Sequence, residues 1–100
     1  MIASIGPNLP HDVLVATGRF AGPLAVDTRR STERASQWLE SKFAPWTKMV
    51  VEAWADGDLD HLEAVVFSRA EDSSQRLYYY VCELQRRGLL SGPEAVIVDI

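Results

Sequence analysis

The 100-residue sequence predicts an α/β fold, and three observations indicate it. Continuous apolar runs lie at residues 64–67 and 95–100, and they fit strands that are covered on both faces, as in a parallel sheet. Amphipathic helical patterns lie between the apolar runs. Glycines and prolines punctuate the chain and divide it into short elements. We therefore predict a Rossmann-like three-layer unit, a short parallel sheet flanked by helices.

The first half of the chain is expected to contain one strand and three helices. Pro10, Asp12 and Gly18 suit the start, the first turn and the end of a short helix. The run PLAV at residues 23–26 predicts a strand. A helix over 31–43 follows, with Ser31 and Thr32 as candidate caps. Pro45 suits the first position of the next helix, which Gly57 ends. Its apolar stripe is Trp46, Met49, Val50, Ala53 and Trp54.

The second half of the chain predicts a strand, a helix and a strand. The strand at 64–67 precedes a helix that runs from about Ser73 to Arg87, capped by Asp72 or Ser73. Leu77, Tyr80, Val81 and Leu84 form its buried stripe. The chain stops on the strand at 95–100, so we expect residues 1–100 to form a single α/β domain that matches half of a larger unit.

Charge and composition limit the functional classes. The net charge of −4 argues against a nucleic-acid partner, which requires a basic patch. No apolar run is long enough to span a membrane, and the N-terminus lacks the features of a secretory signal. The single cysteine, Cys82, permits no disulfide within the chain, which is compatible with the cytoplasm, where we expect the protein to reside.

The turn after the strand at 64–67 is the candidate binding site. Such a turn lies at the carboxyl end of a strand and beside a helix N-terminus, where unpaired N–H groups and the helix dipole favour an anion. Ser68, Arg69, Asp72 and Ser73 are the residues that we expect to bind one. The alternative is that the acidic residues of the turn only cap the helix.

Other chemistry is not indicated. His11 and His61 lie far apart without partners at ligand spacing, so we expect surface histidines and no metal site. Cys82 has no evident activating base, and no catalytic residue or cofactor is expected. Three tryptophans and three tyrosines are many for so small a core, which favours a missing neighbour. Trp54, Tyr78 and Tyr79 would supply a surface for a second copy, domain or subunit.

Three segments resemble one family. LPHDVLVATGRFAGPLAV resembles the opening P-x-E-L-I-x-A-A-G-x-x-P-V of the 2-hydroxyacyl-CoA dehydratase D-component family, whose relatives include benzoyl-CoA reductase subunits. FAPW resembles that family's F-C-P-[FY], and LDHLEAVVFSRAEDSSQRLYYY its LD-x-x-D-x-VVF-x-x-x-CD-x-x-x-RL-x-D. AVIVDI falls where the family has its next strand. The resemblance covers nearly the whole chain.

The resemblance implies a first Rossmann-like domain of a two-domain subunit. Family members dehydrate or reduce acyl-CoA thioesters with a [4Fe–4S] cluster that cysteines hold and an ATP-driven activator reduces. The first two cluster cysteines fall at Ala44 and Glu71 in this sequence, and the third belongs to a later domain. Thiolates hold such clusters, so the iron–sulfur ligands are lost. Cys82 lies roughly 16 Å beyond Glu71 along a helix and cannot substitute.

These departures predict a dehydratase-like domain that is not catalytic by itself. Its role would be structural, or the binding of an acyl-CoA or another anionic small molecule. One alternative is the substrate-binding half of a longer dehydratase-like enzyme, a lyase. Another is a protein-interaction module.

Overall fold

The computed structural model describes residues 1–6, 9–24, 32–39 and 45–98. Within them, four strands form one parallel sheet in the order β2-β1-β3-β4. The strands are β1 (Ile2–Ile5), β2 (Phe20–Pro23), β3 (Ala64–Ser68) and β4 (Glu94–Val98). The helices of the described residues are α1 (His11–Ala16), α2 (Glu33–Trp38), α3 (Pro45–Ala55) and α4 (Asp72–Arg86). This arrangement confirms the predicted α/β fold class.

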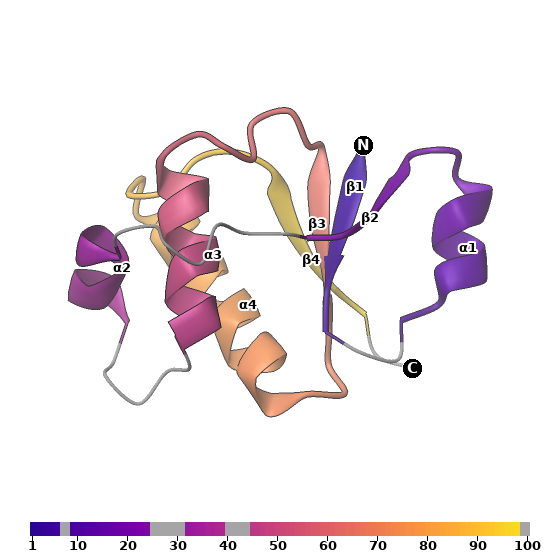
Figure 1. The fold of residues 1–100 in the computed structure, drawn as a ribbon. Coiled ribbons are helices and arrows are strands. Elements are labelled where there is room, and N and C mark those ends of the chain that lie inside the picture. The colour runs from indigo at the N-terminus through magenta and orange to yellow at the C-terminus, as the bar shows by residue number, and fades with distance from the viewer. Residues whose placement is uncertain (7–8, 25–31, 40–44, 99–100) are drawn as a thin grey trace.

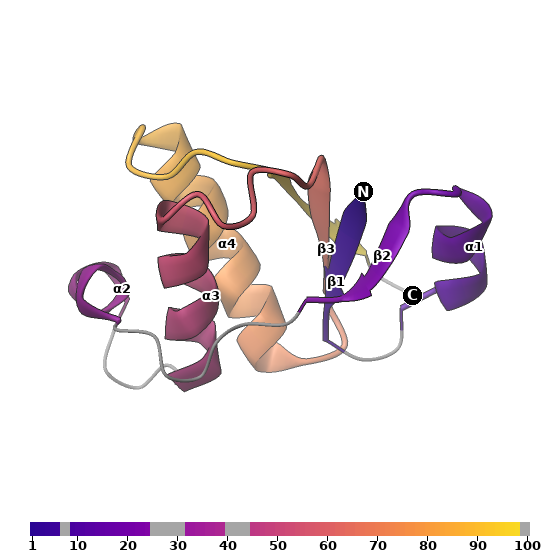
Figure 2. The same ribbon diagram turned by 45° about the horizontal axis from the view of Figure 1, so that its top comes forward.

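The helices lie on both faces of the sheet. Figure 1 shows α1 on one side and α2, α3 and α4 on the other, and the rotated view in Figure 2 preserves this division. The buried side chains separate in the same way, because residues along a strand alternate between its faces. Val65 and Phe67 belong to the larger core, whereas Val66 packs with Leu9 and Leu14 in a smaller one.

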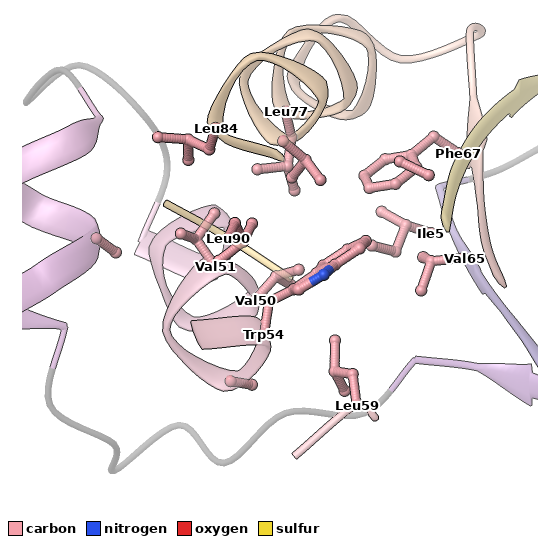
Figure 3. Packing of buried hydrophobic residues seen from close by; sticks show 14 of the residues in the cluster. Ile5, Val50, Val51, Trp54, Leu59, Val65, Phe67, Leu77, Leu84 and Leu90 are labelled. Atoms are coloured by element: carbon pink, nitrogen blue, oxygen red, sulfur yellow. The ribbon is translucent and has the colours of Figure 1, made fainter. Parts of the chain in front are cut away.

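The larger core is built around Trp54 on α3. Its ring stacks on Phe67 of β3 at a centroid distance of 6.3 Å, and Phe67 meets the edge of Tyr78 at 5.8 Å. Figure 3 shows Leu77 of α4 and Leu59 near the same ring. Trp54 is 1 % exposed. Trp54 therefore holds α3 and the sheet together. The prediction that Trp54 joins Tyr78 and Tyr79 in a surface for a partner is wrong for Trp54, because its side chain is buried.

The sequence-based prediction missed β1, the strand between β2 and β3. Its four residues include Ala3 and Ser4, which are both buried, so no continuous apolar run marks the strand. Small residues fit there because neighbouring strands and helices approach from every side. The first described element of the chain is therefore a strand, and not the helix at residues 10–17.

The strand predicted at residues 23–26 is also wrong in position. The structure has the strand at Phe20–Pro23, with Leu24 beyond it, and residues 25–26 lie outside the described residues. Ile2 pairs with Phe20 and Ala3 with Gly22, so Ala21 is an extra residue in a bulge. Gly22 has a φ of +100°, and Pro23 ends an edge strand, a position that tolerates a missing N–H. Gly22 and Pro23 belong to the strand and do not mark a turn before it.

The predicted helical stripes are largely confirmed. On α3, Val50, Ala53 and Trp54 are buried, and on α4 so are Leu77, Val81 and Leu84. Tyr80, predicted as core, is half-buried, and Ser74 takes a buried place on α4 instead. The predicted helix over 31–43 is described as α2, while residue 31 and residues 40–43 lie outside the described residues.

A buried carboxylate joins α2 to α3. Glu52 of α3 is 5 % exposed and accepts hydrogen bonds from the Ala35 N–H at 3.1 Å and from Arg34 Nε at 2.8 Å. Ala35 lies in the first turn of α2, where N–H groups lack partners within the helix. Glu52 thus caps α2 from a neighbouring helix. Burial acts to raise the pKa of this carboxyl, but the bonds from Ala35 and Arg34 outweigh burial and the pKa is lowered.

We predict that this cap makes stability depend on acidity. Because the pKa of folded Glu52 lies below its ordinary value of 4.5, its contribution is complete above that value and is lost as pH falls through the folded pKa. Glu52→Gln should lower the free energy of unfolding by about 1–2 kcal/mol at pH 7, and should flatten the loss of stability below pH 4.5. Urea denaturation between pH 7 and pH 3 measures both effects.

Glu94→Gln is the control, because Glu94 is exposed at the start of β4 and loses the same charge. It should change the free energy of unfolding by less than about 0.5 kcal/mol. Equal effects of the two substitutions would contradict the capping role of Glu52.

Candidate functional site

The strand order places a topological switch point between β1 and β3. The connection after β1 passes through α1 on one face of the sheet, whereas the connection after β3 passes through α4 on the other. In open α/β sheets, ligands bind outside the carboxyl ends of the strands where neighbouring connections diverge in this way. The candidate site therefore lies where Ile5–Gly6 leaves β1 and Ser68 ends β3, at the lower edge of the sheet in Figure 1.

Three small residues meet at this point. An ideal Cβ on Gly6 would lie 2.7 Å from Ser74 Oγ and 2.8 Å from Ser68 Cβ, closer than real Cβ atoms approach their neighbours. Gly6 also has a φ of +93°, which side chains other than hydrogen rarely permit. The end of β1 thus reaches the first turn of α4 only because residue 6 is glycine.

The Ser74 hydroxyl has no hydrogen-bond partner among the described residues. Ser74 is 0 % exposed, and its Oγ is buried beneath Gly6. A buried polar atom without a partner costs about 1–3 kcal/mol, so such atoms are rare and call for an explanation such as strain, a bound water or ion, or a functional role. Trp54 Nε1 in the larger core is a second such atom among the described residues. The described residues include no group of side chains that could hold a metal ion, so metal binding does not explain the buried Ser74 hydroxyl. Helix capping does not explain it either, because the N-cap of α4 is Glu71.

The first turn of α4 is not capped as predicted. The N-cap residue is Glu71, not Asp72 or Ser73, and its side chain makes no capping hydrogen bond. Its backbone is extended, with φ −121° and ψ 133°, and Gln75 is the residue whose N–H donates back to the Glu71 carbonyl. The N–H groups of residues 72–74 precede that bond and have no acceptor within the helix. The prediction that Asp72 or Ser73 is the N-cap of α4 is therefore wrong, and the Glu71 side chain at the N-cap position does not cap the helix with a hydrogen bond.

The four predicted binding residues occupy different places. Ser68 is 1 % exposed, and its Oγ accepts a hydrogen bond from the Ala70 N–H. Its Cβ packs directly against Gly6. The Asp72 side chain is 77 % exposed and pairs with Arg76 at 3.1 Å, away from the interior. Ser73 is half-buried in the first turn. Arg69 is exposed, and its N–H donates to the Val98 carbonyl.

A hollow of about 280 Å³ opens at this edge of the sheet, and none of the four predicted binding residues is among those that line it. Gly6 and Glu71 line it, together with the half-buried indole of Trp46 at the start of α3. Pro23 and Leu24 at the end of β2 supply apolar wall. Sequence reasoning considered Ser74 and Arg76 as helpers in holding an anion, but it missed Gly6, Trp46 and Leu24 as site residues. The glycine that follows IASI was the available signal, but it required β1 to be recognised first.

The donors of the site do not fit an iron–sulfur cluster. Glu71, where the resemblance would place a cluster cysteine, offers a carboxylate, and Ala44 lies outside the described residues. The described part of the chain contains no group of three or more His, Cys, Asp or Glu side chains that could hold a metal ion. His61 is exposed at a smaller hollow of about 210 Å³ beside β1 and β2, and the side chain of His11 is outside the description.

Cys82 lies apart from the site, half-buried on α4. A hydrogen bond with its thiol, together with burial, raises the pKa of Tyr78. Tyr79 is 51 % exposed and contacts only the edge of Tyr78 among described ring pairs. Tyr78 and Cys82 both pack against the larger core. None of the described helices combines the length and apolar character needed to cross a membrane.

Comparison of the chain with protein-family models, with curated proteins and with solved structures finds no match in any of the three.

We predict that Gly6 is far less replaceable than Gly22. Both have φ near +100°, but an added Cβ at Gly22 meets nothing within 4 Å. Gly22→Ala should therefore cost about 1–2 kcal/mol from backbone strain alone. Gly6→Ala adds a clash with Ser68 and Ser74 and should cost at least about 1–3 kcal/mol more. Thermal and urea unfolding of the two variants measure the difference, and equal losses would mean that the contact is looser than described.

Proposed function

We propose that this domain binds an anionic group of a small molecule at the carboxyl edge of its sheet, over the first turn of α4. The observation that carries the proposal is the buried Ser74 hydroxyl without a partner, held beneath Gly6 at the switch point. An anion there would accept hydrogen bonds from the N–H groups of residues 72–74 and from Ser73 or Ser74. Its charge would also be favoured by the dipole of a 15-residue helix.

The site is arranged for binding rather than for catalysis. The hydroxyls of Ser68 and Ser74 have no histidine or lysine beside them among the contacts described, so neither is activated as a nucleophile. Among the described residues, Asp72 pairs with Arg76, and no interaction joins Glu71 or Asp72 to a catalytic partner. We propose a non-catalytic domain, in line with the resemblance to a dehydratase subunit whose cluster cysteines are replaced.

The same resemblance makes an acyl-CoA one candidate ligand. Its thioester and phosphates are anionic or hydrogen-bond accepting, as the helix N-terminus requires. A carboxylate with an aliphatic tail is a simpler ligand of the same polarity, since Leu24, Pro23 and Trp46 offer it apolar contacts. Acetyl-CoA and 4-methylpentanoate are therefore the two probes for the proposal.

An interaction module stays the second candidate. Val13 and Val15 on α1 are each 64 % exposed, and Tyr79 on α4 is exposed on the opposite side of the sheet. These positions could meet a second copy, domain or subunit. The burial of Trp54 removes the strongest part of that argument, so ligand binding has the better support.

We predict opposite effects of Ser74→Ala on stability and on binding. Removing the unpaired hydroxyl should raise the free energy of unfolding by about 1 kcal/mol, because no hydrogen bond is lost and a desolvation cost is removed. The same change should weaken binding of 4-methylpentanoate or acetyl-CoA several-fold. Urea unfolding without ligand and isothermal titration calorimetry measure the two quantities.

Ser36→Ala is the matched control, since Ser36 is exposed on α2 and gains the same helix propensity. It should stabilise by less and leave binding unchanged. If Ser74→Ala destabilises the protein and binding is unaffected, the hydroxyl has an ordinary structural partner and the proposal fails.

A further inference from the structure

We infer that the ligand is a zwitterion of amino-acid size: a carboxylate at the first turn of α4, an ammonium group facing Glu71 and Trp46, and an apolar side chain against Leu24. This inference rests on the proposed function, because it assigns the anion to the same helix end. It adds a subsite for a positively charged group within the same hollow, formed by residues that the anion does not use.

The acidic residues of the turn argue against a ligand that is only anionic. Glu71 lines the hollow and Asp72 follows it at the start of α4, so two carboxylates lie beside the proposed anion. Arg76 pairs with Asp72 and offsets that charge. Among the described interactions, none offsets Glu71. A polyanion would meet like charge at this point, whereas a ligand that carries its own cation would not.

Glu71 and Trp46 together provide what an ammonium group requires. A carboxylate accepts charge-assisted hydrogen bonds from it, and the face of an indole attracts a cation. Both side chains line the same hollow as Gly6, which lies above the Ser74 hydroxyl. The anionic and cationic ends of one small molecule can therefore be held together, with the α4 N–H groups on one side and Glu71 on the other.

The size of the hollow favours a small ligand. Its volume of about 280 Å³ is close to the lower end of the range for small-molecule pockets, which begins near 300 Å³. Ile5, Pro23 and Leu24 supply apolar lining without a described charged group among them. An aliphatic or aromatic amino acid fits this combination of volume, apolar wall and paired charges better than a nucleotide-bearing thioester.

Binding at Ser74 requires a small movement. The hydroxyl is covered by Gly6, so the carboxylate reaches it only when the turn at Gly6 shifts. A glycine with positive φ permits such a shift at low cost. Asp72 is exposed and Ser73 is half-buried, so their N–H groups do not lie under the same cover as Ser74.

The test is a calorimetric titration of the full chain with matched ligands. L-Leucine and L-phenylalanine carry both charges; 4-methylpentanoate and 3-phenylpropanoate lack the ammonium group; 3-methylbutylamine lacks the carboxylate. We expect at least one amino acid to bind at least tenfold more tightly than its analogue without nitrogen, and more tightly than 3-methylbutylamine or acetyl-CoA.

Glu71→Gln and Trp46→Leu locate the cationic subsite. Glu71 makes no capping bond, so Glu71→Gln should leave folding unchanged while it removes the advantage of leucine over 4-methylpentanoate. Binding of 4-methylpentanoate itself should stay the same or improve. Trp46→Leu should reduce the same advantage, and a thermal unfolding curve checks that each variant is folded.

The outcomes separate the two proposals. If 4-methylpentanoate, 3-phenylpropanoate or acetyl-CoA binds as tightly as either amino acid, and Ser74→Ala weakens it, the zwitterion inference is overturned and the anion site stands. If an amino acid binds best but Glu71→Gln has no effect on its advantage, the inference is likewise overturned. If none of these ligands binds, both proposals fail.

Discussion

The close approach of β1 to the first turn of α4 is the contact on which the account of the site depends. It exists because residue 6 has no side chain, and an added Cβ would lie 2.7 Å from Ser74 Oγ. The approach brings together the ends of two central strands and the start of a helix. It also encloses a hydroxyl that has no described partner. A polar atom left in this state, at the place where open α/β sheets bind their ligands, gives the fold a candidate function.

The rest of the fold supports that contact. Trp54 and Phe67 stack between α3 and the sheet and fix α3 against β3, while Leu77 and Val81 seat α4 on the same face. Trp46 is the second residue of α3, so the packing that buries Trp54 two turns later also places the Trp46 indole at the hollow. On the other side of the hollow, the bulge at Ala21 precedes the end of β2 at Pro23, and the Leu24 N–H donates to the Ser4 carbonyl of β1. Core packing and site geometry therefore share the same residues.

The sequence predicted the strands and helices whose patterns are local. The apolar run at 64–67 and the stripes of α3 and α4 were recognised because burial on one face or both leaves a periodic signal. Ile2–Ile5 was missed because a central strand surrounded on all sides uses Ala3 and Ser4, which give no such signal. The strand at residues 20–23 was displaced because Gly22-Pro23 is typical of a turn, although a bulged edge strand accepts the same pair. The binding residues could be predicted only in part for the same reason. Ser68 and Ser73 lie at the site. The importance of Gly6 and Ser74 could not be predicted, because it depends on a contact between segments far apart in the chain.

The most direct test of the anion site is an NMR titration of the ¹⁵N-labelled protein with 4-methylpentanoate. We predict saturable shifts of the backbone amides of Asp72, Ser73, Ser74 and Gly6, with smaller changes at the Trp46 indole. Shifts confined to other basic surfaces, such as Arg86 and Arg87 at the far end of α4, would contradict it. So would the absence of any saturable shift in the first turn of α4.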